Sequence, residues 1–524
     1  MTNYFDKGNF YPPAEHEDRL RRYEENKLLF EGRHKELVDK YQLNPRGKFY
    51  VSINLAGLIS KKSADFLIGD GITVSAGKKT DSNEQKALER IYEDNHLDVR
   101  LYESALGNSY RGDSFFKVRY GYEIEDLDQG LQIGERAVRI ESIPAKYVFP
   151  ETSEYDMKKH VAYHIAIPIK IKTDRDGKRM GDWELEIESH YPNRIVRSTR
   201  QLQVIRTDTE GHPESWKIGG LVNPPEGEET GIGTPLVVHI PNYTTDDLEL
   251  GLDDLSELRP MFDELNNRFS QISNILDKHS DPAMAIPYGV MEVDEFGRPI
   301  FKVSESKVFE VSEKDQIPQY ITWNGQLQEA YSEIDRLTNE ILTVAEIPEV
   351  ALGKSESGTS GSSGLAIRMR MNSLLSKVKR KRMYYNDGVK KLLVLAQLVE
   401  HEGGADVDYE VTAPKLTFTD GLPKDMAEQT SIYLQKTGGA TLMSRKTAIM
   451  ELEGLTEEQA EAEIKRIEVE EDAAREREEE SKGDGDVFNR LNTMYDNINK
   501  RKPSDFNEPQ DEEEQEEDEQ HVEE

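Results

Sequence analysis

Hydrophobic and polar positions change their period several times along the chain. Apolar residues recur every three or four positions in 16–42, 54–71 and 84–109, which predicts helices. Apolar and polar residues then alternate through 160–171, which predicts a half-buried strand, and 182–207 continues the pattern. The first half of the chain therefore predicts an α+β unit, with a helical opening followed by an antiparallel sheet.

Two heptad stripes follow the predicted sheet. We expect helices over about 258–279 and 326–347, packed against each other and against neighbouring copies of the chain. Residues 283–323 lie between them and hold prolines, β-like runs and a turn at 295–297, which predicts a small β-containing tip outside the core of 160–205. An ordinary helical hairpin is the alternative, but the stripes are narrow and the other faces are polar. The first stripe consists of Leu258, Phe262, Leu265, Phe269, Ile272 and Leu276.

The rest of the chain predicts helices, one strand and a polar end. Residues 365–402 predict one long helix with a kink at Gly388, and 407–419 predict a strand. Helices follow to about 480. Residues 483–524 are too charged to bury a core, so we expect this acidic tail to be disordered.

Charge is distributed unevenly over these elements. The 524 residues have a net charge of −35 and contain no cysteine, which excludes disulfides, thiolate zinc sites and cysteine nucleophiles. Residues 451–524 have a net charge of −20 (9 basic, 29 acidic), whereas 365–391 have +8 (9 basic, 1 acidic). The basic run 377–382 predicts either a solvated or inter-subunit face or a DNA contact, and the sequence favours neither.

The search for catalytic chemistry gives no candidate. Residues 353–355 read Gly-Lys-Ser, but a P-loop would need glycine where Pro348 stands, and the preceding segment predicts a helix rather than a strand. His160 and His164 would lie about 13 Å apart on a strand, too far for a shared metal. We therefore expect no enzyme activity, no cofactor and no metal. The longest apolar stretch, 392–399, is too short to cross a membrane.

The order of these elements resembles that of the portal proteins of tailed double-stranded DNA bacteriophages. The similarity covers about 20–435 and is most specific in 53–74, 141–156, 239–286 and 362–371. In 239–286, the residues in family-like positions are Asn242, Asp254, Leu255, Asn266, Ser270 and Asp281-Pro282.

The resemblance implies a ring-forming subunit divided as in portals. Its parts would be a wing (1–254), a first stem helix (255–282), a clip (283–324), a second stem helix (325–350), a tunnel loop (351–364), a long helix returning to the wing (365–430), a helical crown (431–482) and the acidic tail (483–524).

The resemblance also implies where DNA and partner proteins would bind. The clip residues expected to dock partners are Glu292, Asp294, Glu295 and Arg298. Hinge glycines are expected at Gly353, Gly358, Gly361 and Gly364. The residues expected to line the DNA channel are Lys354, Ser355, Ser357, Thr359, Ser360, Ser362, Ser363, Arg368 and Arg370.

The same resemblance implies the partners. We expect further copies of the chain, twelve to a ring, and double-stranded DNA bound without sequence preference. The expected partner proteins are the terminase large subunit, the head-tail connector, and scaffolding and major capsid proteins. The expected location is the portal vertex of the virion, after assembly in the bacterial cytoplasm. Two other classes remain as alternatives: a DNA-packaging ATPase, which would need an intact P-loop, and an acidic cytosolic scaffold, which would not explain the order of the elements.

Overall fold

We describe the fold from a computed structural model, in which the chain forms two compact units, Met1–Pro423 and Lys424–Glu524. The described residues are 4–40, 50–69, 71–77, 82–126, 131–171, 182–208, 211–280, 284–285, 292–300, 319–320, 327–354, 364–404, 407–419, 426–438, 442–453, 460–475 and 493.

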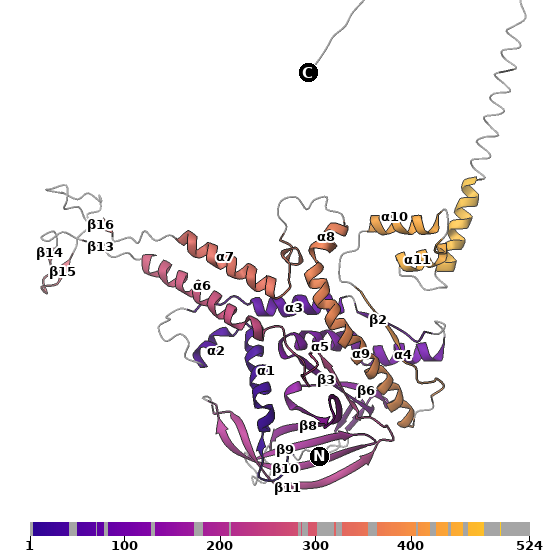
Figure 1. Ribbon diagram of the computed structural model, residues 1–524, viewed down its shortest axis with the longest axis horizontal. Helices are drawn as coiled ribbons and strands as arrows, with labels where there is room; N and C mark the ends of the chain where they lie inside the picture. Colours follow the sequence, from indigo (N-terminus) through magenta and orange to yellow (C-terminus); the bar gives the residue numbers. More distant parts are fainter. Residues whose placement is uncertain are drawn as a thin grey trace, which may run out of the picture. The chain divides into compact units, whose positions relative to one another are not determined.

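A six-stranded antiparallel sheet lies in the first unit, with strand order β1-β11-β10-β9-β8-β7 (Figure 1). The alternation predicted for 160–171 gives a strand, but residues 162–166 at its centre are all buried. One face packs on Phe5 and Tyr11, and the other packs on Tyr23 and Phe115, so both faces are covered. The strands are β1 (Phe10–Tyr11), β7 (Val148–Ser153), β8 (Asp156–Lys170), β9 (Trp183–Tyr191), β10 (Arg194–Thr207) and β11 (Pro213–Glu229).

A second sheet has three antiparallel strands in the order β12-β3-β6, formed by Val237–Pro241, Asp113–Gly121 and Ala137–Ile143. Helix α9 (Asn372–Glu402) packs against all three strands. Two short strands, β4 (Ile124–Asp126) and β5 (Leu131–Ile133), form a separate antiparallel pair.

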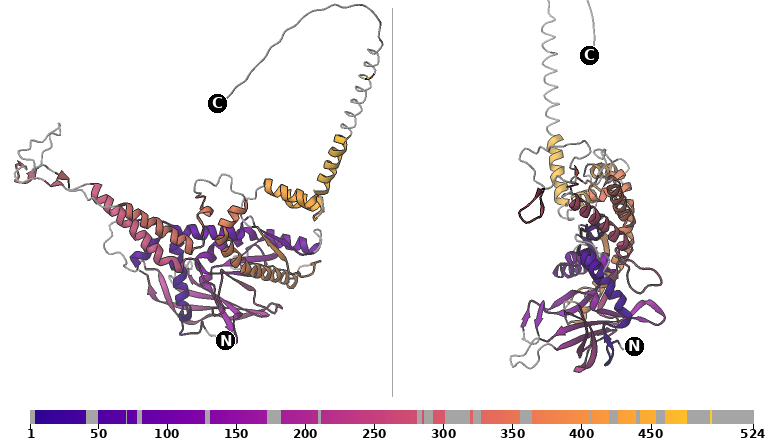
Figure 2. Two further views of the ribbon diagram at one scale, coloured as in Figure 1. Left: turned by 45° about the horizontal axis from the view of Figure 1, so that its top comes forward. Right: turned by 90° about the vertical axis from the view of Figure 1, so that its left-hand side faces the viewer.

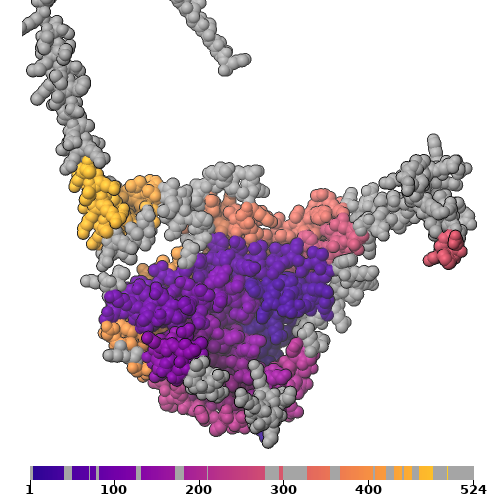
Figure 3. Space-filling model, turned by 180° about the vertical axis from the view of Figure 1, so that it is seen from behind, coloured from indigo at the N-terminus to yellow at the C-terminus, as the bar shows by residue number. Residues whose placement is uncertain are grey.

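Five helices precede the second sheet and contribute to the main core. The segment 16–42 forms two helices rather than one, because Gly32 takes a positive φ of 76° between them. The helix predicted over 54–71 ends earlier, at Ile68, and Gly69 and Gly71 after it both have positive φ. Figure 3 shows these helices, in indigo and purple, as one continuous surface. They are α1 (Glu17–Phe30), α2 (His34–Lys40), α3 (Leu55–Ile68), α4 (Asn83–Asp94) and α5 (Leu97–Arg111).

The two helices predicted from the heptad stripes form and lie side by side (Figure 2). They are α6 (Arg259–Ser280) and α7 (Leu327–Val344). Leu258, Phe262 and Leu265 of the first stripe are 1% exposed, whereas Leu276 near its end is 48% exposed. The stripe is therefore a buried seam at the start of α6 and is open at its end.

Two short antiparallel pairs separate α6 from α7 in the sequence. They are β13 (Met284–Ala285) with β16 (Gln319–Tyr320), and β14 (Glu292–Val293) with β15 (Pro299–Ile300). Neither pair joins the six-stranded sheet.

The long helix predicted over 365–402 is interrupted, but not at Gly388. It forms α8 (Gly364–Arg370) and α9, with buried Met371 between them. Gly388 instead lets α9 approach β12, because a Cβ there would lie 2.6 Å from Cγ1 of Ile240. Of the strand predicted over 407–419, only Lys415–Phe418 forms, as β17, and it pairs with β2 (Ile72–Ser75).

The second unit is helical where it is described, with α10 (Met426–Thr437), α11 (Arg445–Glu453) and a helix over 460–475. Apart from residue 493, the tail predicted over 483–524 lies outside the described residues. Single-turn helices occur at Ala14–His16, Ala145–Tyr147, Ser256–Leu258 and Glu349–Leu352. Within the described part of the chain, no helix combines the length and the apolar character that a membrane span requires.

Candidate functional site

The end of α7 leads into the segment expected to line a channel. The backbone N–H of Glu346 donates to the carbonyl of Thr343 at 3.0 Å, and that of Ile347 donates to the carbonyl of Leu342 at 2.8 Å. These two bonds define a Schellman ending, in which glycine is the usual residue at the left-handed position. Here Glu346 occupies that position with a φ of 59°. Pro348 follows this helix end, so the segment lacks both the strand and the glycine of a P-loop.

A single helical turn, Glu349–Leu352, continues the chain to the expected loop. Gly353 follows with a φ of 72°, a conformation that favours glycine. Lys354 is exposed, and its backbone N–H donates to the carbonyl of Glu349 at 3.2 Å. The other loop residues lie outside the described part: Ser355, Ser357, Gly358, Thr359, Ser360, Gly361, Ser362 and Ser363.

The described chain resumes at Gly364, the first residue of α8. Arg368, Met369 and Arg370 are exposed in succession, and Met371 is buried. Because successive helical residues are about 100° apart, Met369 lies at the centre of this exposed arc with an arginine on each side. The sequence analysis missed Met369, although its position between the two chosen arginines was a signal.

A buried ionic cluster lies where α6 begins. Asp254 is 9% exposed and accepts hydrogen bonds from Lys381 Nζ at 2.5 Å and from Ser109 Oγ at 2.6 Å. Lys381 also donates to Ser63 Oγ at 2.6 Å. Lys377 Nζ lies 3.4 Å from the other carboxylate oxygen of Asp254. Two lysines therefore share one buried carboxylate.

The cluster also contacts the end of α7. Lys377 Nζ donates to the carbonyl oxygen of Ala345 at 3.0 Å. One turn further along α9, the guanidinium of Arg380 pairs with the carboxylate of Glu346. The basic residues of α9 thus reach both Asp254, in the segment before α6, and the turn after α7.

For the two buried lysines, these contacts correct both interpretations of the basic run 377–382. Lys377 is 6% exposed and Lys381 is 2% exposed, so neither forms a solvated or inter-subunit face, and neither is open to DNA. Arg382 donates to the carbonyls of Phe66 and Thr419 within the same chain. Lys379 and Arg380 are the exposed cations of the run. This burial could not be predicted from the basic run itself, because the partners come from distant segments.

The cluster shifts the pKa values of its own groups. Burial alone would raise the pKa of Asp254, but the adjacent Lys377 and Lys381 outweigh it and hold this pKa well below its usual range. Burial lowers the pKa of Lys381 to about 8, against the opposing effect of Asp254. Asp254 is therefore ionised at neutral pH.

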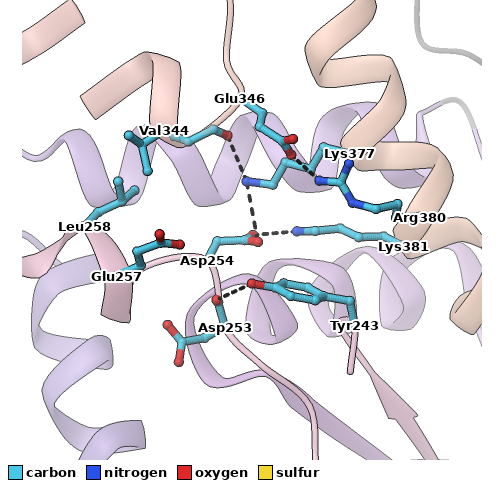
Figure 4. A pocket seen from close by; sticks show the side chains of 11 residues that line it. Tyr243, Asp253, Asp254, Glu257, Leu258, Val344, Glu346, Lys377, Arg380 and Lys381 are labelled. Carbon is cyan, nitrogen blue, oxygen red and sulfur yellow. Dashed lines mark hydrogen bonds and ion pairs between the residues drawn. The ribbon is translucent and has the colours of Figure 1, made fainter. Parts of the chain in front are cut away.

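A hollow of about 230 Å³ lies beside the cluster (Figure 4). Asp253, Asp254 and Glu257 line it from the segment before α6, and α9 contributes Lys377, Arg380 and Lys381. Its remaining lining residues are Tyr243, Leu258, Val344, Ala345 and Glu346. Acidic and basic side chains are mixed around the hollow, so it does not select an anion or a cation by charge alone.

The residues that carried the resemblance in 239–286 have structural roles. Asn242 Nδ2 donates to Asp254 at 3.2 Å. Asn266 accepts from the backbone N–H of Ile53, and Ser270 accepts from that of Val51, both at 2.9 Å. These side chains hold the strand-like segment before α3 against α6. Leu255 is fully buried, and Asp281-Pro282 lies outside the described residues.

The expected partner-docking residues lie on the β14–β15 hairpin. The predicted turn forms, with Gly297 at a φ of 76°. Asp294 accepts the backbone N–H groups of Phe296 and Arg298, and its carboxylate lies 3.2 Å from Arg298 Nε. Asp294 and Arg298 therefore stabilise the hairpin itself. Glu295 is exposed, and Phe296, which the sequence analysis did not select, is 80% exposed. Glu292 is in β14.

The histidines considered as metal ligands have separate partners. His160 Nδ1 lies 2.7 Å from the hydroxyl of Tyr163, and His164 Nδ1 lies 2.8 Å from that of Ser189. Among the described residues, no group of three or more histidine, aspartate or glutamate side chains is arranged to hold a metal ion.

Comparison with known proteins identifies one family. A family model described as phage portal protein, SPP1 Gp6-like, matches residues 11–477. No curated protein shows a significant match to the chain. The family match includes both sheets, α6 and α7, the segment leading to Lys354, and the cluster around Asp254. The chain therefore belongs to the phage portal protein family.

Proposed function

We propose that copies of this chain form the ring-shaped channel at one vertex of the capsid, through which double-stranded DNA is packaged and ejected. The observation that supports this proposal is the family match over 11–477, which extends through almost all of the described residues. Membership of the family implies a ring-forming protein of the virion capsid that interacts with terminase and DNA.

Within this proposal the segments take the roles that the resemblance implies. The two sheets with α1–α5 form the wing, α6 and α7 form the stem, and the β14–β15 hairpin belongs to the clip. The clip docks the terminase large subunit during packaging and the head-tail connector afterwards. Exposed Phe296 and Glu295 at the hairpin turn are the side chains best placed to contact such partners.

The channel lining is assigned to the segment 351–364 and the start of α8. Lys354, Arg368 and Arg370 are exposed and supply weak, sequence-independent contact with phosphates. Twelve copies would carry a net charge of −420 (12 × −35), and a wall of that sign keeps DNA from adhering elsewhere. DNA would therefore meet a few cations in a largely repulsive channel, which suits sliding.

Electron microscopy of the purified full-length chain tests the ring. We expect rings with a central hole, and particles without such a hole would contradict the proposal. The same sample should show no ATP hydrolysis of its own, because Pro348 stands where a P-loop needs glycine. Steady hydrolysis that disappears in Lys354→Ala would favour the packaging ATPase instead.

The lining assignment needs a separate test on assembled particles. Replacing Lys354, Arg368 and Arg370 with glutamine should leave rings intact and change the length or retention of encapsidated DNA. Lys391→Gln is the matched control, because Lys391 pairs with Asp387 elsewhere on α9. Equal DNA content in the triple variant, the control and the wild type would remove these three residues from the lining.

A further inference from the structure

The turn after α7 has a backbone conformation that its residue does not favour. Position 346 is the left-handed position of a Schellman ending, where glycine has no steric penalty. A glutamate with a φ of 59° is strained there. Such strain persists where the side chain has a task that glycine could not perform. The contact that glycine would lose is the ion pair between Glu346 and Arg380.

The charges beneath the turn are also an unusual choice for stability alone. Lys377 and Lys381 are both buried, and Asp254 is the carboxylate that both contact. Well-packed apolar side chains would usually stabilise such a position at least as well as buried ions. Buried charges do, however, specify one geometry, because they tolerate few alternative partners. The strained turn at Glu346 and the buried charges beneath it therefore both indicate that these side chains fix the position of the turn. Stability alone would not require them.

The contacts come from one face of α9. They reach the segment before α6 and the turn after α7, which lie far apart in the sequence. Lys381 holds Asp254, in the segment before α6, while Lys377 and Arg380 hold Ala345 and Glu346, directly after α7. Residues 377, 380 and 381 lie on one face of a helix because they are three and four positions apart. This face thus fastens the start of α6 and the end of α7 to the same turn of α9.

The turn also has space beside it. Val344, Ala345 and Glu346 line the hollow of about 230 Å³ together with Lys377, Arg380 and Lys381 (Figure 4). Close-packed interiors allow little displacement, whereas a turn beside a hollow can shift once its contacts break. Lys377 and Arg380 are the basic residues of α9 that hold the turn across this space.

We propose that Lys377 and Arg380 form a latch that fastens the end of α7 to α9 and thereby fixes the residues that follow, up to Lys354. The proposal rests on the proposed function in one respect, namely that Lys354 belongs to the channel lining. While the latch is closed, a displacement of Lys354 moves α7 and α9 together. When it is open, the turn moves into the hollow and α7 is uncoupled from α9.

Distances between paired spin labels test the latch in the full-length chain. Because the chain has no cysteine, two introduced cysteines are the only labelled positions. One pair is Thr343→Cys with Ser376→Cys, at exposed positions at the end of α7 and on α9, and the other is Lys354→Cys with Ser376→Cys. Labelled chains are diluted with unlabelled ones, so that only distances within one copy are measured.

The latch variant combines Glu346→Gly with Lys377→Met. Glycine at position 346 relieves the strained φ, and methionine at position 377 leaves Lys381 paired with Asp254. The variant should therefore still fold, which its circular dichroism spectrum checks. We expect both distance distributions to become at least twofold wider than in the labelled parent chain. The matched control is Lys391→Met, which removes a cation from an exposed pair on α9 and should leave both widths unchanged.

Unchanged widths in the folded latch variant would overturn the proposal. If the distance distribution of the Thr343 pair widens and that of the Lys354 pair does not, the claim that the latch fixes Lys354 is overturned. Equal widening in Lys391→Met would also overturn it, since any lost cation on α9 would then have the same effect. Failure of the parent chain to form rings would contradict the proposed function, while the distances would still decide whether the latch exists.

Discussion

At the scale of single residues, Asp254 has the largest predicted effect on stability. Asp254→Asn would leave Lys377 and Lys381 buried without a carboxylate partner. Breaking a buried ion pair in this way costs about 3–5 kcal/mol. We expect the free energy of unfolding of the first unit to fall by that amount, as measured by chemical denaturation of the full-length chain.

Lys377→Met provides the comparison for this prediction. It removes one of two lysines and leaves the carbonyl of Ala345 without its donor, a loss of about 1 kcal/mol. If Lys377→Met lowers the free energy of unfolding as much as Asp254→Asn does, the balance of charges is not what stabilises the cluster.

Buried histidines give the first unit a predicted sensitivity to acid. Burial, reinforced by Arg19, lowers the pKa of His16 to about 3, and burial together with His239 lowers the pKa of His160 to about 3. The unfolded chain therefore binds more protons than the folded chain below pH 6.5. We expect the contribution of these histidines to the free energy of unfolding to be constant above about pH 6.5 and to fall steadily towards pH 3.

Denaturation at a series of pH values checks this dependence, with His160→Gln as the comparison. Removing one buried neutral histidine should make the decline below pH 6.5 less steep. An identical decline in the variant and the parent would assign the acid sensitivity to other groups.

At the scale of elements, the contact between α9 and β12 depends on Gly388. In Gly388→Ala the new Cβ would meet Ile240, which is fully buried. Overpacking costs about 1–3 kcal/mol, whereas alanine gains about 1 kcal/mol in helix propensity. We expect a net loss of stability of up to about 2 kcal/mol. In an Ile240→Ala background the loss should disappear, and a persistent loss would place the cause elsewhere.

The segment between α7 and α8 is expected to work by pliability. Replacing Gly358, Gly361 and Gly364 together with alanine removes conformations with positive φ, so we expect less packaged or retained DNA in particles whose rings are intact. Encapsidated DNA is measured against that of the wild type. Failure to form rings would make the segment an assembly element, and unchanged packaging would make it a passive connector.

The elements differ in how far their own sequence determines them. The heptad stripes predicted α6 and α7 to within a few residues, because each stripe records one buried face. The burial of Lys377 and Lys381 could not be predicted, since Asp254 is 127 residues away from Lys381 in the chain. The break at Met371 was missed because an apolar residue fits a helix pattern equally well. The roles assigned to 351–364 remain predictions.

At the scale of the whole molecule, the acidic end is predicted to be dispensable for the ring. Residues 505–524 are highly charged and nearly lack apolar anchors. Deleting them should leave ring formation intact by electron microscopy and size-exclusion chromatography. As a control, a neutral tag of similar length is added to the chain and then deleted. If rings are lost when 505–524 is deleted but not when the tag is deleted, the acidic end is structural.

The cluster around Asp254 also bears on how long a folded subunit lasts. It joins Ser63 to Lys381 across 318 positions, and contacts of such long range form late because the loop must close before they are gained. Interactions that are absent from the folding transition state slow unfolding without speeding folding. We therefore expect Asp254 and Lys381 to set the lifetime of the folded chain, and the rate at which a new chain folds to depend on its local helices and hairpins.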